Sequence, residues 1–390
     1  MTAADGAVLG TTPIYGSAPA PRAFNIVLLA DGFTALQQND FNSACTAFVN
    51  SLQATRPYDE LLPAINVFRV NVRSTDSGAD DPVSAGGTGA TARTYFDATF
   101  GANGIRRLLV CNATTALQVA AAQVPQFTVV LVVVNSTVYG GSGGSIATYS
   151  LASGATEIAL HEIGHSAFGF ADEYAYYAGG NETGHDQHPA GEPTQPNVTT
   201  NSNRDTLKWR WAVATATAIP SMANPNCAQV DSRPSPVLPG TVGLFEGAHY
   251  YHCGAYRPEY DCKMRALGVP FCRVCRQVIS NRISPLANQV VAIGSAYFND
   301  VHLRLDGSAV TQFAGTGGGT VNCQFGVGAW ERFRLRPQAD GTVAIASAQF
   351  DNVYLRLDGS AVTQFSGDGG GLINCQLGVG LWERFNLEIA

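Results

Sequence analysis

Two segments near the C-terminus repeat each other at a spacing of 52 residues. Val-His-Leu-Arg-Leu-Asp-Gly-Ser at 301–308 returns as Val-Tyr-Leu-Arg-Leu-Asp-Gly-Ser at 353–360, and Trp-Glu-Arg-Phe at 330–333 returns at 382–385. A fixed period marks a repeat architecture in which each copy is one supersecondary unit. Both copies combine short alternating segments with glycine-rich turns, which indicates an all-β repeat domain. We place it at residues 288–390, with copies at about 288–338 and 339–390.

The preceding chain alternates strand-like and helix-like segments, which predicts an α/β (α+β) layered domain over residues 23–287. Residues 1–22 are rich in Ala, Gly and Pro and are expected to be a flexible lead-in. Strands are predicted at 24–30, 65–72, 106–110 and 128–134, and helices at 34–52, 156–168 and 271–283, the last stopped by Pro285.

Composition narrows the class of protein further. The 390 residues are 45% hydrophobic and 14% charged, which is typical of a globular chain with sizeable cores. A net charge of −7 gives a nucleic-acid partner no electrostatic support. No apolar run approaches the ~18 residues that a membrane span requires. The N-terminus shows no signal-peptide pattern, so secretion is argued from other features.

Residues 161–165 read His-Glu-Ile-Gly-His, within a proline-free run from Thr156 to Phe168. Side chains four residues apart share one face of a helix, so His161 and His165 can bind one metal ion. Glu162 lies beside them and can act as the general base towards a water that zinc activates. The pattern therefore predicts a hydrolytic Zn²⁺ site on a helix that ends near Gly169. A surface helix with two solvated histidines is the alternative.

The third zinc ligand is less constrained by the sequence. Metzincins place it six residues after the second histidine, where this chain has Ala171, which cannot bind a metal. We predict Asp172, because a short carboxylate just past the helix can turn back towards the metal. Glu173 is the alternative ligand, followed by His249 and His252. A structural Ca²⁺ ion is a separate hypothesis, with the hard oxygen ligands Asp172, Glu173, Glu192 and Asn197.

The metzincin pattern also predicts a methionine turn beneath the metal. Met264 is one of only three methionines and lies in the sequence Cys-Lys-Met-Arg, so we assign the turn to it. An ordinary core methionine is the alternative. No tyrosine follows Met264 closely to stabilise an oxyanion, and Tyr256 and Tyr174 are the candidates to replace it.

Four of the nine cysteines, Cys253, Cys262, Cys272 and Cys275, fall within 23 residues. Disulfides within this group would suit a secreted protein, and we predict them there. A second zinc site is the alternative. It is disfavoured because such sites usually combine two close-spaced cysteine pairs, and only one CxxC pair is present.

Residues 23–284 resemble the bacterial IgA-peptidase-like zinc metallopeptidases, a metzincin-like family. The matching stretches are Asn25-Ile26-Val27 to Asp31-Gly32-Phe33-Thr34, Val67 to Val72, the glycine loop after Tyr139, His161 to Tyr174, Gly254 to Pro258, and Cys262 to Arg265. The resemblance implies a secreted zinc endopeptidase. It does not imply immunoglobulin A as the substrate.

The repeat domain resembles the fascin-like, β-trefoil-type modules attached to many secreted bacterial enzymes. A full trefoil needs three units, and two are visible. Trp330 and Trp382 are expected to be core anchors rather than sugar platforms, because buried aromatic rings dominate core energetics.

The leading prediction for function is a secreted zinc-dependent endopeptidase that hydrolyses peptide bonds in protein or peptide substrates. One alternative is a glycan- or protein-binding protein with a vestigial metal domain, in which the repeat domain binds the ligand. Another is a metal-dependent amidase. The intact set of His161, Glu162 and His165 argues against a vestigial domain, because losing any one of them abolishes the chemistry.

Overall fold

The computed structural model describes residues 5–177, 184–283, 290–295, 297–338, 342–364 and 369–386. The chain divides into two compact units, Met1–Ile279 and Ser280–Ala390. The division falls within helix α5 (Arg273–Ile283). The predicted boundary between residues 287 and 288 and the predicted stop at Pro285 lie outside the described residues. None of the helices within these ranges is long and apolar enough to cross a membrane.

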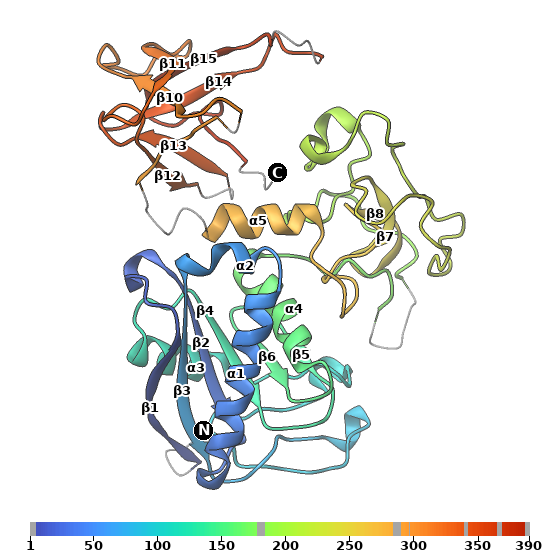
Figure 1. Cartoon of the computed structure of the whole chain (residues 1–390). Coiled ribbons are helices and arrows are strands. Elements are labelled where there is room, and N and C mark those ends of the chain that lie inside the picture. The colour runs from blue at the N-terminus through green and yellow to red at the C-terminus, as the bar shows by residue number, and fades with distance from the viewer. Residues whose placement is uncertain are drawn as a thin grey trace. The chain divides into compact units, whose positions relative to one another are not determined.

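A six-stranded mixed sheet forms the centre of the first unit, in the order β1-β3-β2-β4-β6-β5 (Figure 1). Its strands are β1 (Gly6–Tyr15), β2 (Phe24–Asp31), β3 (Ile65–Ser74), β4 (Val129–Val134), β5 (Gly141–Ser142) and β6 (Ala147–Ser150). The central strands β3, β2, β4 and β6 run parallel, while β1 and β5 pair antiparallel at the two edges. Every residue of β2 and β4 is buried, as continuous apolar strands in a covered sheet require.

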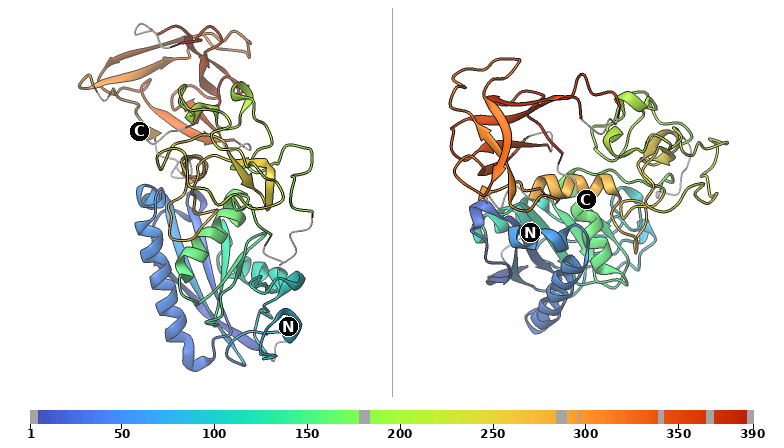
Figure 2. Two further views of the ribbon diagram at one scale, coloured as in Figure 1. Left: turned by 90° about the vertical axis from the view of Figure 1, so that its right-hand side faces the viewer. Right: turned by 45° about the horizontal axis from the view of Figure 1, so that its top comes forward.

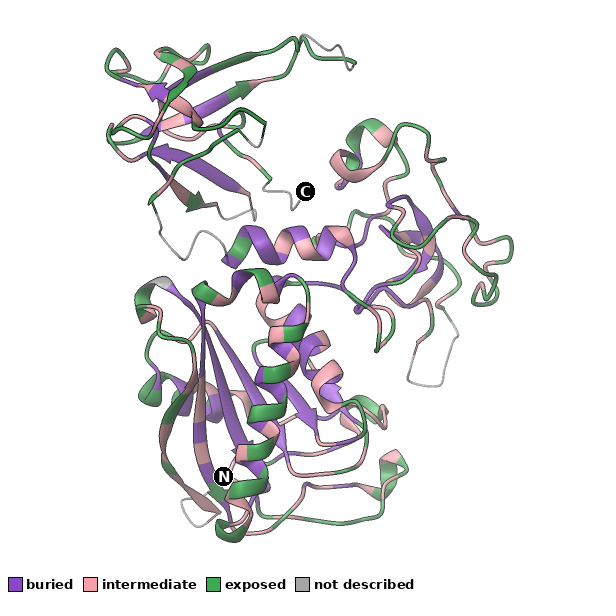
Figure 3. Cartoon of the chain, viewed as in Figure 1, coloured by how far each residue is buried: buried purple, intermediate pink, exposed green. Residues whose placement is uncertain are grey.

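Helices cover both faces of this sheet. They are α1 (Gln38–Ala54), α2 (Tyr58–Leu61), α3 (Ala113–Gln123) and α4 (Ala155–Phe168). Figures 1 and 2 show α1 and α4 on one face and α3 on the other. Figure 3 shows α1 presenting exposed residues outward, away from the buried strands. The layers make the unit a mixed α/β structure, whereas the finer metzincin assignment stays a prediction.

Local signals in the sequence explain where helix α1 begins and where helix α4 ends. A capping box between Thr34 and Gln37 opens a short 3₁₀ turn that leads into α1, close to the start predicted for the helix over residues 34–52. Helix α4 ends at Gly169, whose φ of 67° is the left-handed conformation that favours glycine. The 3₁₀ turn before α1 is Ala35–Gln37, and the other short 3₁₀ turns are Ala20–Arg22, Leu62–Ala64, Val83–Ala85, Ala102–Gly104, Arg204–Thr206 and Arg210–Ala212.

Two expectations for the first unit were wrong. Residues 1–22 are not simply a loose lead-in, because Gly6–Tyr15 forms edge strand β1, paired with β3 from Gly6–Ser74 to Tyr15–Val67. Main-chain hydrogen bonds stabilise this strand, so its side-chain composition gave little signal. Residues 106–110 form no strand, and only isolated bridges join Leu108 to Gly141 and Val110 to Thr99.

The polar segment that follows α4, over residues 184–257, is stabilised by a hairpin, a disulfide and long-range hydrogen bonds. Strands β7 (Phe245–Ala248) and β8 (Tyr251–Arg257) form an antiparallel hairpin. A disulfide joins Cys227 to Cys253. The buried indole of Trp209 donates a hydrogen bond to the carbonyl of Gly243 at 2.8 Å. This segment reaches the helix α4 region through main-chain bonds such as that from His249 to the carbonyl of Asp172.

The second unit contains a two-stranded sheet, β10-β11, and a five-stranded sheet in the order β15-β14-β13-β12-β9. The strands are β9 (Val290–Val291), β10 (Val301–Asp306), β11 (Thr320–Phe325), β12 (Phe333–Pro337), β13 (Val343–Ser347), β14 (Val353–Asp358) and β15 (Leu372–Leu377). All of the described regular elements from β9 onward are strands, as expected for this part of the chain.

The sequence repeat is also a structural repeat. Hairpin β10–β11 pairs Leu303 with Cys323, and hairpin β14–β15 pairs Leu355 with Cys375 in the same register. Arg304 stacks on Trp330 at 4.2 Å, and Arg356 stacks on Trp382 at the same distance. The expected role of Trp382 as a core anchor was wrong, because the residue is 44% exposed. A closed β-trefoil stays a prediction.

Candidate active site

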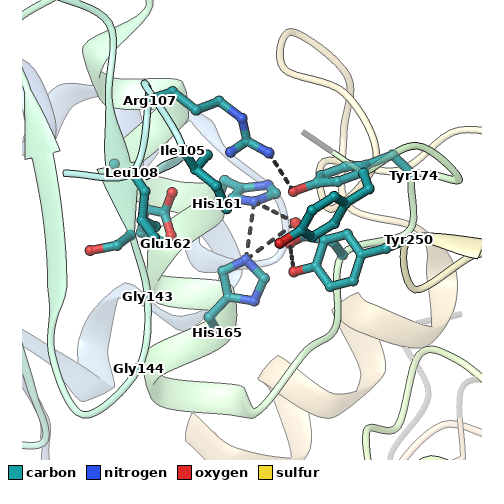
Figure 4. Close-up of a pocket in the computed structure, with 14 residues that line it drawn as sticks. Ile105, Arg107, Leu108, Gly143, Gly144, His161, Glu162, His165, Tyr174 and Tyr250 are labelled. Atoms are coloured by element: carbon teal, nitrogen blue, oxygen red, sulfur yellow. Dashed lines mark hydrogen bonds and ion pairs between the residues drawn. The ribbon is translucent and has the colours of Figure 1, made fainter. Parts of the chain in front are cut away.

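A pocket of about 340 Å³ opens in the first unit beside helix α4 (Figure 4). The predicted residues His161, Glu162, His165 and Asp172 all border it. The remaining lining residues are Ile105, Arg107, Leu108, Gly141, Ser142, Gly143, Gly144, Tyr174, Tyr177 and Tyr250. The walls of the pocket are therefore formed by α4, by the glycine loop around β5 and by the segment that follows the helix.

Helix α4 presents both histidines to one point. Their Nε2 atoms lie 3.1 Å apart. The Nδ1 atom of His161 lies 2.9 Å from the carbonyl oxygen of Lys263, and that of His165 lies 2.7 Å from the carbonyl oxygen of Phe170. A carbonyl accepts only, so each Nδ1 bears the proton and each Nε2 keeps its lone pair. Outer hydrogen bonds of this kind orient metal-binding imidazoles.

Asp172 completes this group. Its Oδ1 lies 3.0 Å from Nε2 of His161 and 3.3 Å from Nε2 of His165. Its Oδ2 accepts a hydrogen bond from the hydroxyl of Tyr250. Oδ1 is buried and has no hydrogen-bond donor. With both imidazoles neutral, three lone-pair-bearing atoms face one another and repel unless a cation lies between them. This arrangement therefore fits a metal ion with nitrogen and oxygen ligands.

The charges in the pocket influence one another. Burial alone would raise the pKa of Asp172, but the two adjacent imidazoles hold it well below its usual value. Burial likewise opposes protonation of His165, yet the Asp172 carboxylate raises the pKa of that imidazole to about 9. A metal ion that binds at Nε2 would displace this proton and leave the imidazole neutral. Burial raises the pKa of Glu162 above its usual value, against the opposing effect of the two histidines. A carboxyl group with a raised pKa suits proton transfer near neutral pH.

The glycine loop approaches the site too closely for larger residues. A Cβ added at Gly143 would lie 2.4 Å from Cβ of His165. A Cβ added at Gly141 would lie 2.7 Å from Oε1 of Glu162. The loop is therefore a close-fitting wall of the pocket, and the glycines allow backbone to contact the site residues directly.

Met264 lies buried under helix α4. A Cβ added at Gly164, between the two histidines in sequence, would come within 2.6 Å of the Met264 sulfur. The Met264 carbonyl accepts a hydrogen bond from the backbone N–H of Glu173, and the preceding Lys263 carbonyl faces His161. The Met264 turn thus contacts the helix and the segment that carries Asp172.

The other proposed zinc ligands lie elsewhere. Glu173 turns away from the pocket towards Cys262, Cys272 and Cys275. His249 hydrogen-bonds to His188, with 3.0 Å between Nδ1 and Nε2. His252 lies with its Nδ1 2.8 Å from the carbonyl of Cys227. Among the described residues, only Asp172 joins His161 and His165 in a metal-capable group.

The four residues suggested for calcium have other partners. Glu192 accepts hydrogen bonds from Thr199 and Thr200 and pairs with Lys208 at 2.9 Å. The Asn197 side chain bonds to Ala171 and to Glu173 instead. The structure therefore gives the calcium hypothesis no support.

The predicted disulfides among Cys253, Cys262, Cys272 and Cys275 were wrong. Cys253 is oxidised, but its partner is the more distant Cys227. The other three are free thiols, all buried. Sequence proximity misled the prediction because Cys253, in strand β8, bonds to Cys227, which lies 26 residues earlier in the chain.

Two pocket residues escaped the sequence analysis, Arg107 and Tyr250. The Arg107 guanidinium donates a hydrogen bond to the Tyr174 hydroxyl at 2.8 Å, and Tyr250 holds Asp172. Both are brought to α4 by long-range folding, and no local motif marks them. Of the two tyrosines suggested for the oxyanion, Tyr174 lines the pocket and Tyr256 does not.

Comparison with known proteins agrees with this geometry. The chain matches the family described as IgA Peptidase M64 over residues 12–233 and 224–283, which together span well over half of its length. The search of curated proteins gave no match. The matched residues include the whole α4 site, Asp172 and the Met264 turn. The chain therefore belongs to the IgA Peptidase M64 family of metallopeptidases.

Proposed function

We propose that this protein is a zinc-dependent endopeptidase in which His161, His165 and Asp172 hold the metal ion. The observation that carries the proposal is the convergence of their Nε2, Nε2 and Oδ1 atoms within 3.3 Å of one another, at the wall of an open pocket. Two imidazoles and one carboxylate form a common protein ligand set of catalytic zinc. Zinc bound there would supply a Lewis acid that activates water and polarises a carbonyl group.

Glu162 is the general base in this proposal. It is 6% exposed, borders the same pocket and follows His161 directly on α4. Its carboxylate would take a proton from water and return it to the amine that leaves. Arg107 and Tyr174 lie on the pocket wall, where their N–H and O–H groups could orient a substrate carbonyl.

The proposed substrate is a protein or peptide, since the family is one of peptidases. We assign catalysis to the first unit and leave the second unit to binding of a glycan or protein ligand. The Cys227–Cys253 disulfide supports a secreted location, because such bonds persist in oxidising compartments.

Replacing Glu162 with Ala tests the mechanism. Both histidines and Asp172 remain, so zinc should stay bound while hydrolysis of casein falls by roughly 10²- to 10⁴-fold. Zinc content and the rate of casein cleavage are the two measurements. A variant that cleaves casein as fast as the wild type would refute the role of Glu162. Zinc-loaded wild type that cleaves small amides but no peptide would favour the amidase alternative.

A further inference from the structure

A second group of potential metal ligands lies behind the active site, in the same unit. One ligand atom each from Glu173, Cys262, Cys272 and Cys275 lies within 4.8 Å of the other three. All four residues are at most 2% exposed. Cys272 immediately precedes α5, and Cys275 lies in its first turn. The N-terminal end of a helix favours thiolates, which are the form of cysteine that binds metals.

The distances in this group match a tetrahedral zinc site. Zinc–sulfur bonds of about 2.3 Å place two sulfurs about 3.8 Å apart, and a zinc–oxygen bond of about 2.1 Å places an oxygen about 3.6 Å from each sulfur. Sγ of Cys262 lies 3.8 Å from Sγ of Cys275. Oε1 of Glu173 lies 3.6 Å from Sγ of Cys275 and 3.9 Å from Sγ of Cys272.

The surroundings of these atoms also fit a bound cation. The backbone N–H of Cys272 donates to Sγ of Cys262 at 3.3 Å, and that of Cys275 donates to Sγ of Cys272 at 3.4 Å. Such outer hydrogen bonds support metal-bound thiolates. Asn197 donates to Oε1 of Glu173 at 2.9 Å, while the buried Oε2 of Glu173 has no hydrogen-bond partner. A buried carboxylate oxygen without a donor is costly unless a cation neutralises it.

We infer that Glu173, Cys262, Cys272 and Cys275 bind a second, structural zinc ion. Four protein ligands and full burial leave no open position for water or substrate, which distinguishes a structural from a catalytic site. The inference does not depend on the proposed peptidase activity. It also explains how one chain can hold a disulfide at Cys227 and keep three other cysteines reduced nearby, because metal-bound thiolates are withdrawn from pairing.

The second site is connected to the first by two short segments. Cys262 leads through Lys263, whose carbonyl orients His161, to Met264 beneath the helix. Glu173 follows Asp172 directly, and its N–H bonds to the Met264 carbonyl at 2.8 Å. The structural zinc would therefore act as a positioning element for both ligand-bearing segments of the active site.

Metal content tests the inference on the full-length protein. The wild type should contain two zinc ions per chain by elemental analysis, and a His161→Ala, His165→Ala double variant should contain one. Loaded with cobalt, that double variant should show the sulfur-to-cobalt charge-transfer absorption of a thiolate site. Adding Cys262→Ser should weaken this band, and replacing Cys272 and Cys275 with Ser as well should remove it. Cys45→Ser is the matched control, since Cys45 is also a buried free cysteine but lies outside the group, and it should keep the band.

Two outcomes would overturn the second site. One is a double histidine variant that binds no zinc or shows no sulfur-to-cobalt band. The other is a thiol count below the expected seven in denatured, chelator-treated wild type, with the missing pair mapped by peptide analysis to two of Cys262, Cys272 and Cys275. Both measurements need no cysteine variant to fold. Neither reads peptidase activity, so failure of the proposed function would be seen separately, in the casein assay.

Discussion

The two metal-capable groups are built from neighbouring residues but differ in access. His161, His165 and Asp172 line an open pocket, and both histidines are partly exposed. Glu173 and its three cysteines are fully enclosed and line none of the described pockets. The first set leaves a place for water and substrate, whereas the second offers four protein ligands and no opening. The difference shows that access, more than the presence of donor atoms, separates a reactive site from a structural one.

The backbone around residues 171–173 explains why Asp172 faces the open pocket while its neighbour Glu173 faces the buried cysteines. The side-chain amide of Asn197 holds both main-chain groups of Ala171, at 2.8 Å and 2.9 Å. The Asp172 carbonyl accepts a hydrogen bond from His249, and the Glu173 N–H donates to Met264. Every residue from 171 to 173 is thus fixed by a main-chain hydrogen bond, which sets the direction of both side chains.

The largest expected effect comes from exchanging the two carboxylates for alanine one at a time. Asp172→Ala should weaken zinc binding at the pocket by at least about 100-fold, because even outer-shell changes cost 10- to 100-fold. It should leave the sulfur-to-cobalt band intact. Glu173→Ala should do the reverse and weaken the thiolate site.

Both variants are titrated with metal. Casein cleavage reports zinc binding at the pocket, and the sulfur-to-cobalt absorption reports metal binding at the thiolate site. If Asp172→Ala retained pocket zinc while Glu173→Ala lost it, the assignment of the third catalytic ligand to Asp172 would be wrong.

A smaller effect is expected from narrowing the wall of the open site. Gly143→Ala adds a Cβ that would overlap His165, so the imidazole must shift. A displacement of about 1 Å can cost about 10²-fold in rate, and we expect casein cleavage to fall by about that factor. The thiolate band should not change. Gly359→Ala is the control, because no atom lies within 4 Å of its added Cβ and its φ is ordinary. Equal rates for the two variants would contradict the close fit of the loop.

The smallest expected effect concerns the ion pair between Lys263, which lies between Cys262 and Met264 in the chain, and Glu157 on α4. The ammonium of Lys263, 3% exposed, pairs with Glu157 on α4. Burial opposes ionisation of Glu157, but the Lys263 partner holds its pKa below the usual value. A lowered carboxyl pKa stabilises the fold above the unfolded pKa of about 4.5, and this contribution is lost as the pH falls through the folded pKa.

Glu157→Gln should therefore lower the free energy of unfolding by about 1–2 kcal/mol at pH 7, with a smaller difference near pH 3. Denaturant unfolding at the two pH values measures this. Glu60→Gln removes a pair with the exposed Arg56 and should have no measurable effect. A Glu157→Gln effect that grew towards low pH would contradict the proposed linkage.

The sequence predicted the local parts of the site well. The spacing of His161 and His165 is sufficient to place both on one helix face, and the capping box at Thr34 and the glycine at 169 mark helix ends in the structure. Strand β1 was missed because an edge strand depends on main-chain pairing with β3, which composition does not reveal.

Contacts between distant segments could not be predicted in the same way. Glu173 is 99 residues from Cys272 in the chain, so no spacing rule joins the carboxylate to the CxxC pair. The sequence analysis disfavoured a metal site because it expected a second close-spaced cysteine pair. In the proposed site, the CxxC pair is instead joined by one cysteine and one glutamate. Tyr250 reaches Asp172 across 78 residues, for the same reason without a local signal.

The main-chain hydrogen bonds that fix residues 171–173 limit how the length of this segment can change within the family. Deleting or inserting one residue between Gly169 and Glu173 would rotate the following side chains, so the carboxylate meant for the pocket would face the cysteines. A substitution there harms one site, whereas a change in length harms both at once. We therefore expect natural homologues to tolerate length differences in the polar loops farther along, and to keep the count of residues from His165 to Glu173 unchanged.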